Sequence, residues 1–116
     1  MELTFDELSE AGRGKFPGLL GIEFVDGSAG AVRGRLALRP EHMAPNGYLH
    51  AGAVIGLADS LCGYGTMLSL PAGAVGFTTI ELKANFLRTA LEGVIEGESR
   101  ILHGGRTTQI WDATVA

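Results

Sequence analysis

Hydrophobic residues recur at intervals of three and four positions between residues 51 and 70, and they do so almost all the way round the helical wheel. Leu57, Leu61 and Leu68 follow this spacing, with small apolar residues between them. An α-helix turns once in 3.6 residues, and a helix that is apolar on every side is typical of a protein interior. The pattern therefore predicts one long buried helix over about residues 51–70.

Elsewhere hydrophobic and polar residues alternate with the period of two that is typical of β-strands. The clearest case is residues 78–86, for which we predict a long strand with one wet face. The predicted strands are residues 19–25, 31–38, 78–86, 94–102 and 106–115. Asp26-Gly27-Ser28 has the composition of a hairpin connection between the first two strands. At the N-terminus, Thr4 and Glu7 form a capping box that predicts a short helix over about residues 4–11.

This order of elements indicates an α+β fold in which an antiparallel sheet wraps around one long buried central helix. The length of 116 residues suits a single domain, residues 1–116, and no linker or repeat divides it. The net charge of −4 argues against a general nucleic-acid binder. The single cysteine, Cys62, excludes an intramolecular disulfide framework, and the three histidines lack the spacing of metal ligands, so no metal is expected.

Targeting and membrane signals are not evident in the sequence. The N-terminal residues are acidic, whereas a signal peptide begins with basic residues followed by apolar ones. The uncharged residues 60–80 contain glycines and Pro71, which argue against a continuous membrane-spanning helix. We therefore expect a cytoplasmic protein that does not associate with membranes.

An aspartate lies in the middle of the predicted buried helix. Asp is a poor helix former and is rarely buried without a partner. Asp59 therefore either faces a crevice or a solvated subunit boundary, or it carries chemistry. The sequence leaves both interpretations open.

The start of the same helix offers a second candidate group. The first backbone N–H groups of a helix have no partner within it, so the Ala51 N–H could bind a substrate oxyanion. His50, which precedes it, could equally be a packing residue. Ala51 and Asp59 are eight residues apart, which is about 12 Å along one helix. The two groups could meet at one carbonyl only if two copies of the helix pack antiparallel, which would make the protein at least a dimer.

These residues resemble a known family. The stretch Gly-Tyr-Leu-His-Ala-Gly at residues 47–52, with Ala58 and Asp59 following, is similar to the motif of the hotdog-fold acyl-CoA thioesterases. The similarity is greatest to the phenylacetate-degradation type and to one class of 4-hydroxybenzoyl-CoA thioesterase. Residues 85–88 and 105–112 agree with it. The resemblance implies hydrolysis of an acyl-CoA, or an aryl-CoA, to coenzyme A and a carboxylic acid.

The resemblance also implies an assembly and a set of residue roles. Two subunits would join their sheets edge to edge and form the active site between them, and the dimers would pair into homotetramers. Asp59 would act as nucleophile or general base, and the Ala51 N–H of the neighbouring subunit would polarise the thioester carbonyl. His50 would hold the turn and Thr79 would assist the water. The residues expected to contact coenzyme A are Gly52, Lys83, Arg88, Arg106 and Thr107. No cofactor is implied, because coenzyme A is part of the substrate.

The chain departs from the family pattern in two respects. Ala44 stands where many relatives carry Asn or Gln as a second carbonyl contact, and Asn46 could take over that contact. Relatives also continue for one more strand after the position of Ala116. The first departure favours an alternative function, a non-catalytic acyl-CoA-binding or sensing protein. A third hypothesis is an acyl-thioester hydratase or dehydratase. The acyl group is not determined by the sequence.

Overall fold

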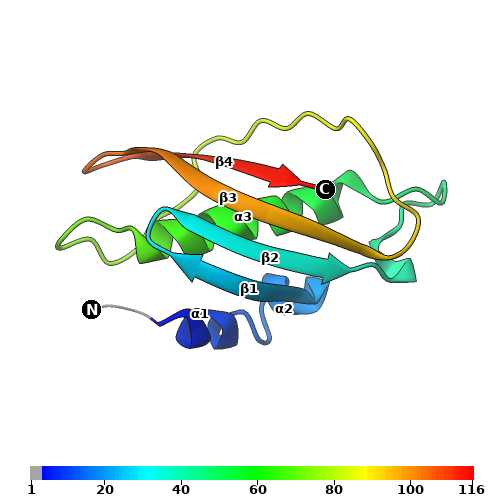
Figure 1. Ribbon diagram of the computed structural model, residues 1–116, viewed down its shortest axis with the longest axis horizontal. Coiled ribbons are helices and arrows are strands. Elements are labelled where there is room, and N and C mark those ends of the chain that lie inside the picture. Colours follow the sequence, from blue (N-terminus) through cyan, green and yellow to red (C-terminus); the bar gives the residue numbers. More distant parts are fainter. Residues whose placement is uncertain (1–3) are drawn as a thin grey trace.

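The computed structural model describes residues 4–116, apart from the side chain of Phe5. Within this range four strands form one antiparallel sheet in the order β1 (Ile22–Ser28), β2 (Ala31–Ala37), β3 (Val94–Gly104) and β4 (Gln109–Val115). Figure 1 shows the sheet crossing over one long helix, α3 (Ala51–Leu68). The predicted α+β arrangement of an antiparallel sheet on a central helix is confirmed.

The core lies between the helix and the inner face of the sheet. Val32, Leu36, Leu57 and Leu61 are fully buried there. By length and composition α3 could also cross a membrane, a property that core helices of soluble proteins share. Burial of its leucines under the sheet instead supports the predicted central helix, which ends two residues earlier than expected, at Leu68.

Two cross-strand glycines allow α3 to lie close to the sheet. Gly34 on β2 pairs with Gly97 on β3. A Cβ atom on Gly34 would lie 2.8 Å from the Leu61 side chain, and one on Gly97 would lie 2.6 Å from it. Contacts this short do not occur between real side chains, so the helix can approach at this point only because both positions lack a Cβ. Ser99, also fully buried, adds a hydrogen bond of 3.0 Å from its Oγ to the Leu61 carbonyl.

Two short helices precede the sheet. In α1 (Phe5–Ala11) the Thr4 side chain accepts a hydrogen bond from the Glu7 N–H, as the capping box predicts. The second helix, α2 (Phe16–Leu20), overlaps the start of the predicted strand 19–25, so that prediction is wrong at its first residues. Pro17 favours the first turn of a helix, and Gly21 ends the helix with a φ of 86°, a conformation that glycine adopts readily.

The first hairpin turns later than the sequence suggested. Asp26-Gly27-Ser28 belongs to β1 and pairs with β2, so the predicted connection there is wrong. A bulge between Phe24 and Asp26 shifts the register, and the chain reverses at Ala29 and Gly30. At the other hairpin, β3 continues to Gly104 and β4 begins at Gln109, three residues later than predicted.

Residues 78–86 do not form the predicted strand. They have no ladder with any strand in residues 4–116, and every residue of the segment is exposed. In Figure 1 the segment is an arc without a strand arrow, drawn above β4 in this view. Within the described range β4 pairs with β3 only, so its other edge is open. Alternation of side chains favours a strand, but a strand forms only where a neighbour can pair with its N–H and C=O groups.

Candidate active site

The start of α3 carries a backbone donor that no other group in the described part of the chain uses. The His50 Nδ1 atom accepts a hydrogen bond of 2.7 Å from the Gly52 N–H, and the His50 carbonyl accepts one of 3.0 Å from the Ala53 N–H. Between them, the Ala51 N–H has no hydrogen-bond partner among the residues that the structure describes. Ala51 is exposed, so this donor is available to a ligand oxygen.

Asp59 lies on the side of α3 that the sheet does not cover. Asp59 is exposed, although Leu57 and Leu61 on either side of it are fully buried. Its carboxylate makes no hydrogen bond or ion pair within residues 4–116. Because α3 is continuous from Ala51 to Leu68, the separation of about 12 Å between Ala51 and Asp59 holds, and one chain cannot bring both to the same atom.

The loop before α3 is a short hairpin. Met43 and Leu49 form an isolated antiparallel bridge, and the Ala44 N–H donates to the Tyr48 carbonyl at 2.7 Å. Asn46 lies in the turn, where its side-chain oxygen accepts a hydrogen bond of 3.1 Å from the Tyr48 N–H. In the single chain the side-chain oxygen of Asn46 therefore stabilises the turn, and the side-chain NH₂ group of Asn46 remains available to a ligand.

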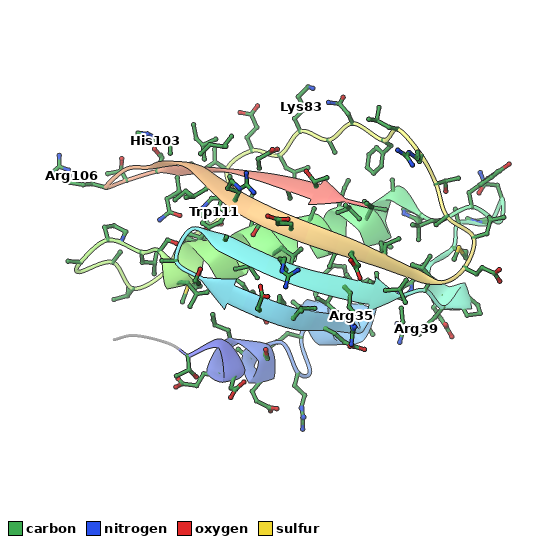
Figure 2. All side chains as sticks on the ribbon, viewed as in Figure 1. Arg35, Arg39, Lys83, His103, Arg106 and Trp111 are labelled. Carbon is green, nitrogen blue, oxygen red and sulfur yellow. The ribbon has the colours of Figure 1, made fainter. Side chains whose placement is uncertain are left out.

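The other predicted residues lie on two segments that follow α3 in the chain. Thr79, Lys83 and Arg88 are exposed on the segment between α3 and β3. Figure 2 shows Lys83 pointing away from the body of the protein. Arg106 and Thr107 lie in the turn between β3 and β4, at the end of the sheet where α3 ends. Arg106 and Thr107 thus lie at the other end of α3 from Ala51, whereas Gly52, another predicted coenzyme A contact, directly follows Ala51. Within the described residues no group of three or more His, Cys, Asp or Glu side chains is arranged to hold a metal ion.

Cys62 is one turn beyond Asp59 on α3. Burial is the largest of three effects that together raise the pKa of its thiol to about 11; the other two are the negative charges of Asp59 and Asp112. The thiolate is the reactive form of cysteine, so a raised pKa makes this thiol unreactive at neutral pH. The structure therefore supports the interpretation of Cys62 as a packing residue.

We expect Cys62 to react with a disulfide reagent at pH 8 about a hundredfold more slowly in the folded protein than in urea. The thiolate fraction falls about tenfold for each unit by which the pKa is raised above its ordinary value. Release of the coloured thiolate from the reagent measures both rates. Equal rates in the folded and unfolded chains would show that the thiol is not shielded. Asp59→Asn should increase the folded rate, because it removes one of the two charges that oppose ionisation.

Comparison with known proteins decides the family. The model of the thioesterase superfamily matches residues 46–116, which include the hairpin turn, all of α3, β3 and β4. The chain belongs to the thioesterase superfamily. Among its relatives, the proofreading thioesterase EntH of Klebsiella pneumoniae is 32% identical over 114 residues, which cover 98% of this chain and 82% of that protein. The 1,4-dihydroxy-2-naphthoyl-CoA hydrolase of Escherichia coli is 28% identical over 98% of this chain and 83% of its own length.

A solved structure shows the same fold in this superfamily. A variant of a thioesterase from Pseudomonas aeruginosa superposes with a TM-score of 0.90 at 28% identity, covering 100% of this chain and 84% of that one. The family and fold predicted from the residue motif are therefore confirmed, and with them the enzyme class of a thioester hydrolase. The phenylacetate-degradation branch stays a prediction.

One residue of the site region was missed by the sequence analysis. His42, one of the three histidines that lack the spacing of metal ligands, is 3% exposed and hydrogen-bonded on both ring nitrogens. Its position eight residues before His50, directly after Arg39-Pro40-Glu41, was the available signal. The His50 N–H donates a hydrogen bond to the His42 carbonyl, and this contact depends on the hairpin between the two residues, which periodicity does not predict.

Proposed function

We propose that this thioesterase-superfamily protein hydrolyses acyl-CoA thioesters at a site formed by two copies of the chain. The observation that carries the proposal is a pair of unused groups on α3. Ala51 offers a helix-start N–H without a partner, and Asp59 offers an exposed carboxylate without a partner, both within the described residues. A donor for an oxyanion and a base for water are what hydrolysis of a thioester requires.

The chemistry divides between these two groups. The Ala51 N–H binds the thioester oxygen, on which negative charge develops as the carbonyl carbon becomes tetrahedral. Asp59 takes a proton from water as the water oxygen bonds to that carbon, and the C–S bond then breaks. The sulfur of coenzyme A leaves as a thiolate and receives a proton, which yields the thiol and the carboxylic acid. In the alternative route the Asp59 carboxylate itself attacks the carbonyl carbon and displaces the coenzyme A thiolate as the C–S bond breaks, and water then hydrolyses the resulting anhydride to the carboxylic acid and free Asp59.

Two features support a site that is shared between copies. The separation of about 12 Å on one rigid helix excludes joint action by the Ala51 and Asp59 of the same chain. The segment between α3 and β3 also exposes large apolar side chains, with Ile80 83% and Leu87 89% exposed. A soluble protein usually covers such a surface with a partner. We therefore propose a homodimer that builds the site, with homotetramers as the full assembly.

The exposed cations suit the phosphates of coenzyme A. Lys83 and Arg88 on the segment after α3, and Arg106 in the β3–β4 turn, form none of the ion pairs in residues 4–116. Together with the backbone of Gly52 and the hydroxyl of Thr107, we propose them as coenzyme A contacts. Thr79 is proposed to orient the attacking water and Asn46 to offer its amide to the substrate carbonyl. We place the protein in the cytoplasm, where coenzyme A thioesters occur.

Ala44 favours one alternative, a protein that binds acyl-CoA without cleaving it. The Ala44 side chain has no polar atom, and the Ala44 N–H is taken by the Tyr48 carbonyl. A second carbonyl contact at this position is therefore missing. Tight binding of an acyl-CoA without release of free thiol would favour this alternative over hydrolysis.

A mixture of two inactive variants is expected to regain activity. In a dimer of Asp59→Asn with Ala51→Pro subunits, one site has both changes and the other has neither. We expect roughly a quarter of the parent activity when equal amounts of the two variants are mixed, unfolded and refolded together. Half of the resulting dimers contain one subunit of each variant, and each of these dimers has one intact site out of two. Thiol release from a panel of short, medium, long and aryl acyl-CoAs measures it. Each variant refolded separately is the control, and a mixture no more active than the controls would refute the shared site.

A further inference from the structure

His42 is a buried histidine whose ring holds two backbone groups. Its Nδ1 atom accepts a hydrogen bond of 3.0 Å from the Arg39 N–H. Its Nε2 atom lies 2.7 Å from the Leu20 carbonyl. A backbone N–H can only donate and a carbonyl can only accept, so these two partners fit the ring tautomer with its proton on Nε2. The Arg39 Nη2 atom, 3.3 Å from the same Nε2, can only donate and is therefore a neighbour of the protonated nitrogen and not its hydrogen-bond partner. The residue is 3% exposed, and it belongs to the short 3-10 helix η1 (Pro40–His42).

The backbone of His42 is the base of the hairpin that leads into α3. Its carbonyl accepts a hydrogen bond of 2.9 Å from the His50 N–H. The Met43–Leu49 bridge and the turn around Asn46 close the hairpin above that bond. His50 in turn caps α3 through its Nδ1 atom, and its peptide bond carries the unpaired Ala51 N–H. The direction of the Ala51 N–H therefore depends on the position of His50, and the hydrogen bond from the His50 N–H to the His42 carbonyl holds His50 in place.

The ring of His42 fastens this hairpin to a part of the protein that is already seated on α3. Leu20, whose carbonyl it contacts, ends α2. The Leu20 side chain packs against α3 at Gly56, where a Cβ atom would lie only 2.5 Å from the Leu20 Cδ1. Gly56 is one turn before Asp59. A second link is the Arg39 guanidinium, which donates to the Leu19 carbonyl at 2.9 Å.

We propose that His42 is a positioning residue for the reaction, which aligns the Ala51 N–H with the substrate carbonyl by fixing the hairpin to α2. The inference rests on the proposed function of Ala51 as the oxyanion donor. His42 does not touch the substrate. Hydrogen bonds aimed at a developing oxyanion lose much of their effect when they are misplaced by about 1 Å, so loss of the His42 links should lower the rate more than the affinity.

The test compares three substitutions of His42 that keep different ring contacts. His42→Ala removes both, His42→Asn keeps an acceptor near the Nδ1 position, and His42→Gln keeps a donor near the Nε2 position. We expect kcat to fall roughly 10- to 100-fold in His42→Ala with KM changed by less than about threefold. His42→Gln should recover most of the rate, because it retains the link to Leu20, and His42→Asn should recover less. If His42→Ala does not fold, the difference between the other two variants decides.

A matched control is Ser99→Ala. Ser99 is fully buried and hydrogen-bonded to the Leu61 carbonyl, but it lies on β3, outside the hairpin. The Ser99→Ala variant should be less stable than the parent protein, but its kcat should not fall as that of His42→Ala does. If His42→Ala and Ser99→Ala have equal kcat, or His42→Gln and His42→Asn both match the parent, the positioning role is refuted.

Hydrogen exchange of the His50 amide separates this inference from the proposed function. The His50 N–H donates to the His42 carbonyl, so its exchange should be at least about tenfold faster in His42→Ala than in Ser99→Ala. Unchanged exchange would refute the positioning role even if activity falls. If the parent protein cleaves no acyl-CoA, the proposed function fails, whereas the exchange result still reports on the link between His42 and the hairpin.

Discussion

Replacing Asp59 by asparagine is expected to lower kcat/KM for the best acyl-CoA substrate by about 10³-fold while leaving the folded protein intact. The carboxylate is the exposed base nearest the middle of α3, and asparagine cannot accept the proton of water. Loss of a general base costs roughly 10²- to 10⁴-fold in rate. The side chain has no hydrogen-bond or ion-pair partner within residues 4–116, so its replacement removes no stabilising contact.

Asp112→Asn is the matched control for Asp59→Asn. Asp112 is also an exposed carboxylate near Cys62, but it lies on β4. The control should retain the activity of the parent within about threefold, and thermal unfolding of both variants should agree with the parent within a few degrees. Thiol release under saturating and subsaturating substrate gives kcat and KM. Activity of Asp59→Asn close to that of the parent would exclude Asp59 from the reaction.

Replacing Ala51 by proline is expected to lower kcat by about 10²- to 10³-fold, the usual cost of losing one oxyanion donor. Proline has no N–H, and this position is the first of α3, where proline fits a helix and the N–H has no partner within residues 4–116. The residue before a proline must be extended, and His50 already has a φ of −67° and a ψ of 132°. The substitution therefore removes one donor and little else.

Ala51→Gly retains the N–H and serves as the comparison for Ala51→Pro. It should keep kcat within about threefold of the parent, although glycine weakens the first turn of the helix slightly. Circular dichroism of both variants should match the parent, because α3 is held mainly by Leu57 and Leu61 in the core. Full activity in Ala51→Pro would show that another group binds the thioester oxygen.

The accuracy of the sequence predictions varied with the kind of interaction each element needs. The central helix was predicted almost to its ends, because the apolar spacing that indicates a helix in the sequence is also the spacing that places those residues against the core. Two errors near β1 arose from local backbone effects, the helical turn at Pro17 and the bulge before Asp26. The largest error was the segment 78–86, whose alternation is real but whose pairing partner is not among the described strands.

For the candidate site, the motif identified Ala51 and Asp59, and the structure showed that each is exposed and unpaired within the described part of the chain. The roles proposed for Thr79, Lys83 and Arg106 stay predictions. His42 was not identified, because its contacts join residues 20, 39, 42 and 50 through a hairpin that no periodic pattern marks.

The sequence by itself determined the family, the central helix and the distance between its two chemical groups, since helical rise converts eight residues into about 12 Å without further information. Only the tertiary structure decided which face of the helix is open and which donor is free. Those properties depend on the sheet that covers Leu57 and Leu61 and on the hairpin that uses the Gly52 N–H but leaves that of Ala51. Local sequence preferences do not distinguish one helix face from another or one helix-start N–H from the next. Contacts between residues that are distant in the sequence make that distinction.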